Sequence, residues 1–492
     1  MERIIMCSII GLKGYGIADA KCMLDVLSHR GNDAKGIYYQ NELYLNDDVN
    51  LLDDNLGDES FILAHNLLSI VGVNQTQPLI SDNLVLVSNA EIYNYKELVD
   101  KYGFDALDGK SDCEIIIRMI EYYYEGNLEE AVQNTIKYLD GDYAFCVYDH
   151  ENYMLVRDRM GVKPLYYSFD GEKFAFTSEQ KALKRIGCKN ISNLNPRYAI
   201  INDKIKRIHP DYQRCESDKS YTQLKQELKN ALTNAVKKRV EGLDEVALLF
   251  SAGVDSTLVA VLLKKLDINF TAYTIGVENS QDLQTARKVA QDLDIPLKYK
   301  IITQGDVEEY FFDTADAIED DNLMKIGVGM TINMTSRLAS EDGHKVILSG
   351  QGADELFCGY NRYKNKFDKP QQLLDELTHD LNNMYHVNLE RDDKATMNNS
   401  LELRVPFLDK GVVDVATRMP IKHMLKSDDD KIRKHILRSV GLELGVPEEV
   451  AYRPKKAAQY GTGIDKIIKK KLSKKQEFKE FIEKSRKNNK RQ

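Results

Sequence analysis

Phe250-Ser251-Ala252-Gly253-Val254-Asp255-Ser256 is the stretch that says most about the fold. The apolar run Val246–Phe250 predicts a buried strand, and Thr257–Leu266 has the periodicity of a helix. Small residues at a strand–helix turn let the backbone approach a phosphate, whose charge the helix N-terminus attracts. Asp255 has the same charge as a phosphate, so its natural use is to hold Mg²⁺ against one. The stretch therefore predicts a phosphate loop in an α/β domain.

A second strand–turn–helix pattern lies further along the chain, at Val346–Phe357. Between the two loops, Phe270–Ile275 reads as a strand and Gln281–Leu293 as a helix. This alternation predicts a parallel sheet. An acidic pair at one helix start usually only compensates the helix dipole, but two such loops in one domain are much harder to explain in that way.

The first 205 residues have a different pattern, with short apolar runs between polar and turn-forming residues. They predict an α+β sandwich, with strands at Leu84–Val87, Ala144–Tyr148 and Tyr153–Val156 and helices at Ala18–Leu27 and Cys113–Tyr124. We therefore expect a first domain at 1–205, a polar linker at 206–220, a second domain at 221–465 and a lysine-rich, solvated tail at 466–492.

Composition excludes several classes of protein. The chain has 492 residues, enough for two to four domains, and no apolar run that approaches the ~20 residues of a membrane span. The start of the chain does not resemble a secretory signal, so we expect a cytoplasmic protein. A net charge of −9 argues against nucleic acid as a main partner. The seven cysteines form no CxxC pair, which argues against a disulfide framework or a zinc site.

The motifs of the C-terminal part resemble those of asparagine synthetases. Phe250–Ser256 is similar to the SGGxDS loop of ATP-pyrophosphatases, with Ala252 in place of a glycine, and Ser349–Phe357 is similar to the family's SGxGxDExF. Met397–Asp409 resembles SLExRVPFLD, and Arg453–Gln459 resembles RxKxxxQ.

This resemblance implies roles for individual residues. Asp255 and Asp354 would share Mg²⁺, and Lys455 would stabilise charge on the pyrophosphate leaving group. Gln351 replaces a family glutamate that is thought to handle a proton during attack by ammonia, which a glutamine cannot do. The implied ATP-binding residues are Phe250, Ser251, Gly253, Asp255, Ser256, Ile275, Ser349 and Gly350.

The N-terminal part resembles a class II glutamine amidotransferase, in which a cysteine freed at the N-terminus is the nucleophile. The matching segments are Met6–Gly11, Ser28–Asp33, Asn89–Asn94, Ser111-Asp112, Leu139–Gly141 and Arg157–Tyr167. The resemblance implies an α+β N-terminal-nucleophile glutaminase sandwich followed by an α/β parallel-sheet ATP-pyrophosphatase domain. Cys7 would attack glutamine, with its own α-amine as base. Asn89 and Ala90 would form the oxyanion hole, and Glu91 and Asp112 would hold the glutamine α-amine.

Four departures from the family pattern bear on this chemistry. Five residues precede Met6, so Cys7 works only if translation starts at Met6 or a propeptide is cleaved. Ala90 and Ser8 replace glycines, which are milder changes. Leu67 stands where the family has an arginine that grips the glutamine carboxylate. Charge-assisted bonds contribute roughly 1.5–3 kcal/mol each. We therefore expect a KM for glutamine raised on the order of tenfold or more, unless another cation substitutes.

The acid substrate is less well marked than the nucleotide site. Met324–Gly329 matches the family's aspartate-binding segment, but the family arginine falls near Gly327, and Lys325 is the alternative cation. Aspartate is expected from the family alone. The resemblance thus implies an ATP- and glutamine-dependent asparagine synthetase. We expect an internal path for ammonia and only small molecules as substrates.

The sequence also fits other functions. An ammonia-dependent amide synthetase with an inert first domain and an adenylating amidotransferase acting on another acid both fit the departures. A non-catalytic scaffold is disfavoured by the intact phosphate loops. The sequence favours neither a monomer nor a homodimer.

Overall fold

The structure is a computed structural model that describes residues 5–56, 60–69, 76–104, 111–454, 461–470, 472, 475, 476, 478, 480 and 481. The chain forms two compact units. The first comprises Met1–Asp211 together with Tyr385–Asp393, and the second comprises Tyr212–Met384 and Lys394–Gln492. No described helix has the length and apolarity that crossing a membrane requires.

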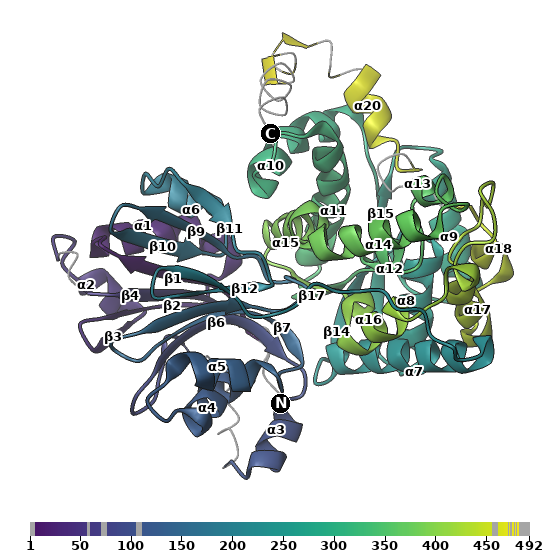
Figure 1. Ribbon diagram of the computed structural model, residues 1–492. Helices are drawn as coiled ribbons and strands as arrows, with labels where there is room; N and C mark the ends of the chain where they lie inside the picture. Colours follow the sequence, from purple (N-terminus) through teal and green to yellow (C-terminus); the bar gives the residue numbers. More distant parts are fainter. Residues whose placement is uncertain are drawn as a thin grey trace. The chain divides into compact units, whose positions relative to one another are not determined.

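Two antiparallel sheets stack face to face in the first unit (Figure 1). Within the described residues, one sheet has the order β11-β9-β10-β1-β4-β2-β3 and the other β13-β12-β8-β7-β6-β5. The strands are β1 (Ile5–Lys13), β2 (Ala34–Tyr39), β3 (Glu42–Leu45), β4 (Ile62–Ser69), β5 (Leu79–Ile80), β6 (Val85–Ile92), β7 (Gly141–Tyr148), β8 (Tyr153–Arg157), β9 (Tyr166–Asp170), β10 (Lys173–Thr177), β11 (Ile191–Asn193), β12 (Tyr198–Ile201) and β13 (Lys204–Arg207).

Helices cover both outer faces of these sheets. In Figure 1, α1 and α6 lie on one side and α4 and α5 on the other. The result is a four-layer α–β–β–α arrangement, which confirms the predicted α+β sandwich. The helices of this unit are α1 (Ile17–Val26), α2 (Asp47–Leu51), α3 (Tyr95–Tyr102), α4 (Glu114–Tyr123), α5 (Leu128–Ile136) and α6 (Gln180–Arg185).

The alternation of side chains along each strand decides which residues lie between the two sheets. In β1, Ile9 packs in the core between the sheets, whereas Ile10 packs beneath the outer helices. In β6, Val87 faces the layer between the sheets and Ala90 faces the outer helices. Residues two positions away share a face, so Cys7 in β1 and Asn89 in β6 both point into the layer between the sheets.

A parallel sheet forms the centre of the second unit and confirms the predicted α/β class. In the described part of the chain its order is β16-β15-β14-β17-β18, and each neighbouring pair is parallel. Helices α8 and α11 contact both β14 and β15. The strands are β14 (Glu245–Leu249), β15 (Asn269–Gly276), β16 (Leu297–Ile301), β17 (Val346–Leu348) and β18 (Glu402–Arg404).

The helices of the second unit precede, connect and follow these strands. They are α7 (Tyr221–Val240), α8 (Val254–Lys265), α9 (Gln281–Asp292), α10 (Gln304–Ile318), α11 (Leu323–Glu341), α12 (Ala353–Leu356), α13 (Asn361–Lys364), α14 (Pro370–Met384), α15 (Glu390–Met397, which begins in the first unit), α16 (Lys410–Thr417), α17 (His435–Leu444), α18 (Glu448–Ala451) and α20 (Ile464–Lys470).

The strand order contains one point at which the direction of winding changes. From β14 the chain proceeds to β15 and β16 on one side, and β17 and β18 follow on the other side of β14. The carboxyl ends of β14 and β17 therefore flank a topological switch point, where open α/β sheets bind their ligands. Both sequence-predicted phosphate loops begin at these two strand ends.

The C-terminal tail corrects one expectation. The sequence predicts a solvated tail at 466–492, but of its described residues Ile468, Leu472 and Phe478 are buried in a core with α10 and α11. Phe478 packs edge-on against Phe311, with ring centroids 4.9 Å apart. The lysines of α20 occupy the exposed side of an amphipathic helix, and the sparse apolar residues between them make the contacts.

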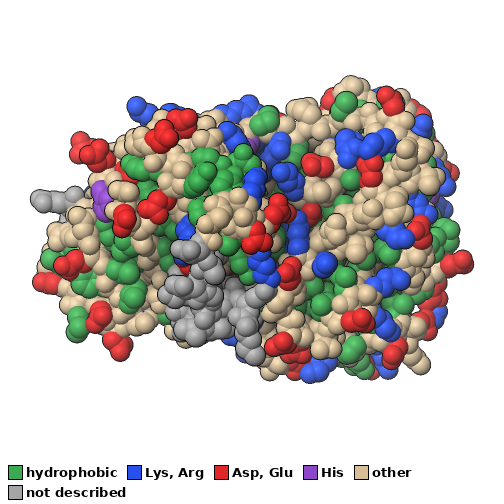
Figure 2. Space-filling model, turned by 90° about the horizontal axis from the view of Figure 1, so that it is seen from below, with side chains coloured by type: hydrophobic (Ala, Val, Ile, Leu, Met, Phe, Trp, Pro, Cys, Tyr) green, Lys and Arg blue, Asp and Glu red, His purple; other side chains and the backbone are tan. Residues whose placement is uncertain are grey.

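Acidic and basic side chains are mixed over the face drawn in Figure 2. This mixture accords with a modest excess of acidic residues over the whole chain.

Candidate active sites

The phosphate loop joins β14 to α8 in the second unit. The backbone N–H of Phe250 still donates to the Tyr273 carbonyl at 2.9 Å, and Gly253 caps the helix. The hydroxyls of Ser251 and Ser256 lie 3.2 Å apart across the turn, and the N–H of Gly253 donates to Ser251 Oγ at 3.4 Å. The loop thus brings two hydroxyls and the start of a twelve-residue helix to the switch point.

Ala252 adopts a left-handed backbone conformation in this loop, with φ of 52°. A side chain with a Cβ costs roughly 1–2 kcal/mol there, whereas glycine adopts the conformation freely. The departure from the glycine-rich loop pattern therefore falls where glycine is preferred on physical grounds. The loop nevertheless forms, with strain stored at one residue.

The second loop packs directly on the first. Ser349 continues from β17, its N–H donates to the Arg404 carbonyl at 3.0 Å, and its hydroxyl accepts the N–H of Gln351 at 3.1 Å. A Cβ added at Gly350 would lie 2.9 Å from the Cβ of Asp255. A larger residue at position 350 would therefore push the two loops apart.

The two predicted metal-binding carboxylates meet at one buried lysine. Lys434 Nζ lies 2.9 and 2.8 Å from the two carboxylate oxygens of Asp255, and 2.6 Å from Asp354 Oδ1. The Lys434 side chain is 1% exposed. Lys434 and Arg433 both have φ of 55°, and such strain in non-glycine residues gathers at functional sites. Sequence reasoning missed Lys434.

Glu355 adds a third carboxyl group close to this centre. Burial is the main cause that raises the pKa of Glu355 to about 7, and the charge of Asp354 is the second cause. The Tyr360 hydroxyl donates to Glu355 Oε1 at 2.6 Å. The two carboxylates of Asp255 and Asp354 and the carboxyl group of Glu355 thus lie close to the ammonium of Lys434.

The predicted nucleophile of the first unit is fully buried in β1. Cys7 lies opposite Leu67 of β4 in the register of the sheet, and the two side chains pack with Ala34. Strand β1 continues upstream of Cys7 to Ile5, which pairs with Ser69. The surroundings of Cys7 on the β4 side are therefore apolar.

Asn89 supplies polar groups to the same layer between the sheets. Its side chain is wholly buried, and neither amide atom has a hydrogen-bond partner among the described residues. Buried polar atoms almost always have partners, so an unpartnered amide indicates a group that a ligand satisfies. Ala90 follows Asn89 in β6 and pairs with Tyr143 of β7.

Acidic groups lie at the end of β6. Glu91 and Asp112 are buried, and Asp112 Oδ2 accepts the backbone N–H of Ile92 at 2.6 Å. Cys113 is also buried and its thiol donates to the Ala90 carbonyl at 3.5 Å.

These neighbours act on the thiol of Cys7, the predicted nucleophile. Burial raises the pKa of the Cys7 thiol well above its usual value. The charges of Cys113, Asp112 and Glu91 raise it further, and that of Lys163 lowers it. A thiol in these surroundings needs a base to become a nucleophile.

Family models match both parts of the chain. A glutamine amidotransferase domain model matches residues 6–198, and an asparagine synthase model matches 227–373 and 365–488. The chain belongs to the asparagine synthase family. A Methanocaldococcus jannaschii protein with the name of a glutamine-hydrolysing asparagine synthetase is 41% identical over 94% of this chain and 95% of its own length. Asparagine synthetase B (glutamine-hydrolysing) of Escherichia coli K12 is 30% identical over 94% of this chain and 83% of its own.

A family member of this kind uses ATP, whose phosphates commonly bind Mg²⁺. No cluster of three His, Cys, Asp or Glu side chains able to hold a metal occurs among the described residues. Mg²⁺ is commonly held by one or two carboxylates together with substrate phosphates. Asp255 and Asp354, which both contact one ammonium, fit that mode of binding.

The predicted aspartate-binding segment of this family lies at the start of α11. Lys325 is paired with Asp320 at 2.7 Å, so its charge is already compensated within the protein. Gly327 is buried in the helix. Ile275 is buried near the end of β15, beside the strand that leads into the phosphate loop. Lys455 lies outside the described residues.

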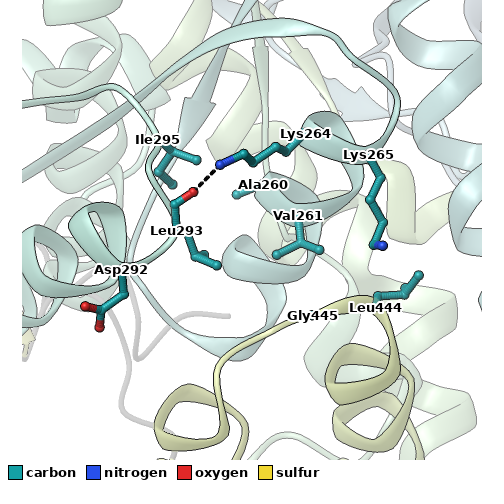
Figure 3. Close-up of a pocket in the computed structure, with 9 residues that line it drawn as sticks. All are labelled: Ala260, Val261, Lys264, Lys265, Asp292, Leu293, Ile295, Leu444 and Gly445. Carbon is teal, nitrogen blue, oxygen red and sulfur yellow. Dashed lines mark hydrogen bonds between the residues drawn. The ribbon is translucent and has the colours of Figure 1, made fainter.

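A pocket of about 340 Å³ lies at the far end of α8 from the phosphate loop (Figure 3). In Figure 3, the Lys264 side chain extends toward Leu293 and donates to its carbonyl at 2.5 Å. Ala260, Val261 and Leu444 are apolar residues of its lining. None of the predicted site residues of the asparagine synthase family lines it.

Proposed function

We propose that the chain is a glutamine-dependent asparagine synthetase. It converts aspartate, glutamine and ATP into asparagine, glutamate, AMP and pyrophosphate. The observation that carries the proposal is the meeting of Asp255, Asp354 and Lys434 at the carboxyl ends of β14 and β17. The names of the relatives support aspartate as the acid.

The first step in the second unit activates the acid. A side-chain carboxylate oxygen of aspartate attacks the α-phosphorus of ATP, the bond to pyrophosphate breaks, and β-aspartyl-AMP forms. Lys434 and the N–H groups at the start of α8 stabilise the charge on the departing pyrophosphate, and Lys455 adds to them. Mg²⁺ would supply further neutralisation of the phosphates at Asp255 and Asp354. The remaining nucleotide contacts are proposed at Phe250, Ser251, Gly253, Ser256, Ile275, Ser349 and Gly350.

The second step makes the amide. Ammonia attacks the activated carbonyl carbon, and AMP leaves with the oxygen that came from the carboxylate, while the proton that the nitrogen loses passes to the departing phosphate. Gln351 lies in the turn beside Ser349 and can orient the ammonia, but its amide takes no proton. Exclusion of water protects the adenylate from hydrolysis.

The first unit supplies the ammonia. Cys7 Sγ attacks the side-chain carbonyl carbon of glutamine, ammonia leaves, and water hydrolyses the glutamyl thioester. The unpartnered Asn89 amide and the N–H of Ala90 hold the oxyanion. Glu91 and Asp112 hold the α-amine of glutamine. Because burial raises the pKa of the thiol, a base is required, and we propose that removal of the residues before Cys7 frees its α-amine for that role.

A second candidate function is ammonia-dependent synthesis with an inert first unit. The observation that favours it is the apolar, buried side chain of Leu67 opposite Cys7, where a cation would favour the carboxylate of glutamine.

One experiment separates the two functions. The protein is produced from its own gene, its mature N-terminus is determined by intact mass, and asparagine formation is assayed on the same sample. We expect a chain that starts at Cys7 and forms asparagine and AMP from glutamine. A chain that keeps the residues before Cys7 and responds only to ammonia would support the second candidate and contradict the first.

A further inference from the structure

Glutamine is a zwitterion, so a site for it needs a cation for the α-carboxylate as well as carboxylates for the α-amine. Glu91 and Asp112 offer the carboxylates. Strand β4 offers no cation beside the nucleophile, because Leu67 is the residue opposite Cys7. The cation must therefore come from another element of the first unit.

Lys163 is a buried lysine in the turn that follows β8, and its exposed fraction is 2%. Asp158 fixes this turn. Its carboxylate accepts the backbone N–H of Met160 at 3.1 Å, of Val162 at 3.0 Å and of Lys163 at 3.1 Å. Lysines are almost never buried to this extent unless they are paired, so the ammonium belongs in an anionic environment.

The same turn is tied to the strand pair that carries the glutaminase residues. The N–H of Asp158 donates to the Tyr143 carbonyl at 2.6 Å, and Tyr143 lies opposite Ala90 in the β6–β7 register. Asn89 and Glu91 are the neighbours of Ala90. The backbone of Lys163 is therefore held by hydrogen bonds to the end of β7 that adjoins the oxyanion and amine-binding residues.

The charge of Lys163 acts on the thiol of Cys7. It lowers the pKa of the Cys7 thiol, against the effect of burial, whereas Glu91 and Asp112 raise it. Positive and negative charges thus both act on the sulfur of Cys7. A zwitterion bound next to that sulfur requires charges of both signs.

We infer that Lys163 binds the α-carboxylate of glutamine in place of a cation on β4, and thereby makes the first unit specific for an α-amino-acid amide. The inference rests on the proposed function, since glutamine is its nitrogen donor. The competing role is that of an internal counter-ion, in which Lys163 only balances Glu91 and Asp112.

Ligand truncation distinguishes the two roles. Binding is measured by calorimetry on the chain that begins at position 7 and carries Cys7→Ala. The ligands are glutamine, 4-aminobutanamide, which lacks the α-carboxylate, and glutaramate, which lacks the α-amine. We expect the parent to prefer glutamine to 4-aminobutanamide by about 10- to 100-fold. Lys163→Met should abolish that preference and weaken glutaramate equally, while 4-aminobutanamide binds as before. Lys173→Met, at an exposed lysine of β10, should change nothing.

Each other outcome decides against the inference. An equal loss for glutamine and 4-aminobutanamide in Lys163→Met would assign the counter-ion role. Glutamine binding with an unchanged preference would overturn the inference and leave the proposed function standing, whereas a parent that binds no glutamine would overturn both. If Lys163→Met melts below the assay temperature, Lys163→Gln takes its place with the same expected loss. Adding Leu67→Arg to either variant should restore the preference for glutamine.

Discussion

At the scale of single residues, the second unit depends most on Lys434. Its ammonium offsets two carboxylates that would otherwise repel each other at the start of α8 and α12. Removing one member of a buried charge cluster leaves the others unpaired, which destabilises more than the loss of an exposed ion pair. We propose that the same ammonium contacts a phosphate when Mg²⁺ is held by the two carboxylates.

Replacing Lys434 by methionine should therefore abolish most of the synthetase reaction. We expect pyrophosphate release to fall by at least about 100-fold, the usual loss on removing one preorganised charge donor. Glutaminase activity should be retained. Lys431→Met changes an exposed lysine of the same segment and should keep full activity. A loss below tenfold for Lys434→Met would contradict the role proposed for this residue.

Ala252 permits a prediction about stability. Because its φ is 52°, Ala252→Gly should stabilise the second unit by about 1 kcal/mol, relieving left-handed strain. Ala260→Gly, inside α8, should destabilise by about 1 kcal/mol, because glycine is a poor helix former. Urea denaturation of both variants measures the two effects. If Ala252→Gly lowers the free energy of unfolding, as Ala260→Gly does, Ala252 is unstrained.

The sequence predicts a site residue when the residue lies in a recognisable local motif. Asp255 and Asp354 each lie in a strand–turn–helix motif that is visible in the sequence, and the structure brings them together. Lys434 lies far along the chain from both loops and precedes an ordinary amphipathic helix, so nothing local marks it. Lys163 is missed for a related reason, because only burial distinguishes it from an exposed turn lysine.

At the scale of elements, periodicity predicts the strands and helices around both sites. The predicted helix Gln281–Leu293 matches α9 to within one residue, and Val246–Phe250 corresponds to β14 within one residue at each end. Periodicity fails at the tail, where lysines outnumber the apolar residues that α10 and α11 bury. Composition thus hides the buried face of a short amphipathic helix.

The tail makes a measurable contribution to the second unit. Ile468→Ala should lower the free energy of unfolding of this unit by about 2–5 kcal/mol, because it empties a buried site. Lys469→Ala, next to it on the exposed side of α20, should stay within about 0.5 kcal/mol of the parent. Chemical denaturation compares the two. Similar values for both variants would mean that the tail is solvated, as its composition suggests.

At the scale of the whole molecule, one segment belongs to a different unit from its neighbours in the sequence. Residues 385–393 fall inside the predicted second domain, 221–465, but belong to the first unit. Within that unit, Asp393 pairs with the fully buried Arg30 at 2.7 Å, and Glu390 accepts the Tyr166 hydroxyl at 2.7 Å. The predicted boundaries remain a prediction, and no sequence pattern marks this returning segment.

The division into two units also predicts that their chemistries can be separated. Cys7→Ala should abolish glutamine-dependent asparagine formation and retain ammonia-dependent formation, because the synthetase residues all lie in the second unit. Cys22→Ala, at a half-buried cysteine outside the site, should keep both activities. Assays with each nitrogen source measure the effect. Glutamine-dependent synthesis that survives Cys7→Ala would exclude Cys7 as the nucleophile.

We expect this chain to activate aspartate as an adenylate at the site built around Asp255, Asp354 and Lys434. The most direct test supplies aspartate labelled with ¹⁸O in its side-chain carboxylate, together with ATP and glutamine or ammonia, and measures the mass of the products. Attack of that carboxylate on the α-phosphorus predicts asparagine and AMP, with one ¹⁸O atom transferred to the AMP phosphate. Unlabelled AMP, or label in inorganic phosphate with ADP as the nucleotide product, would contradict the account.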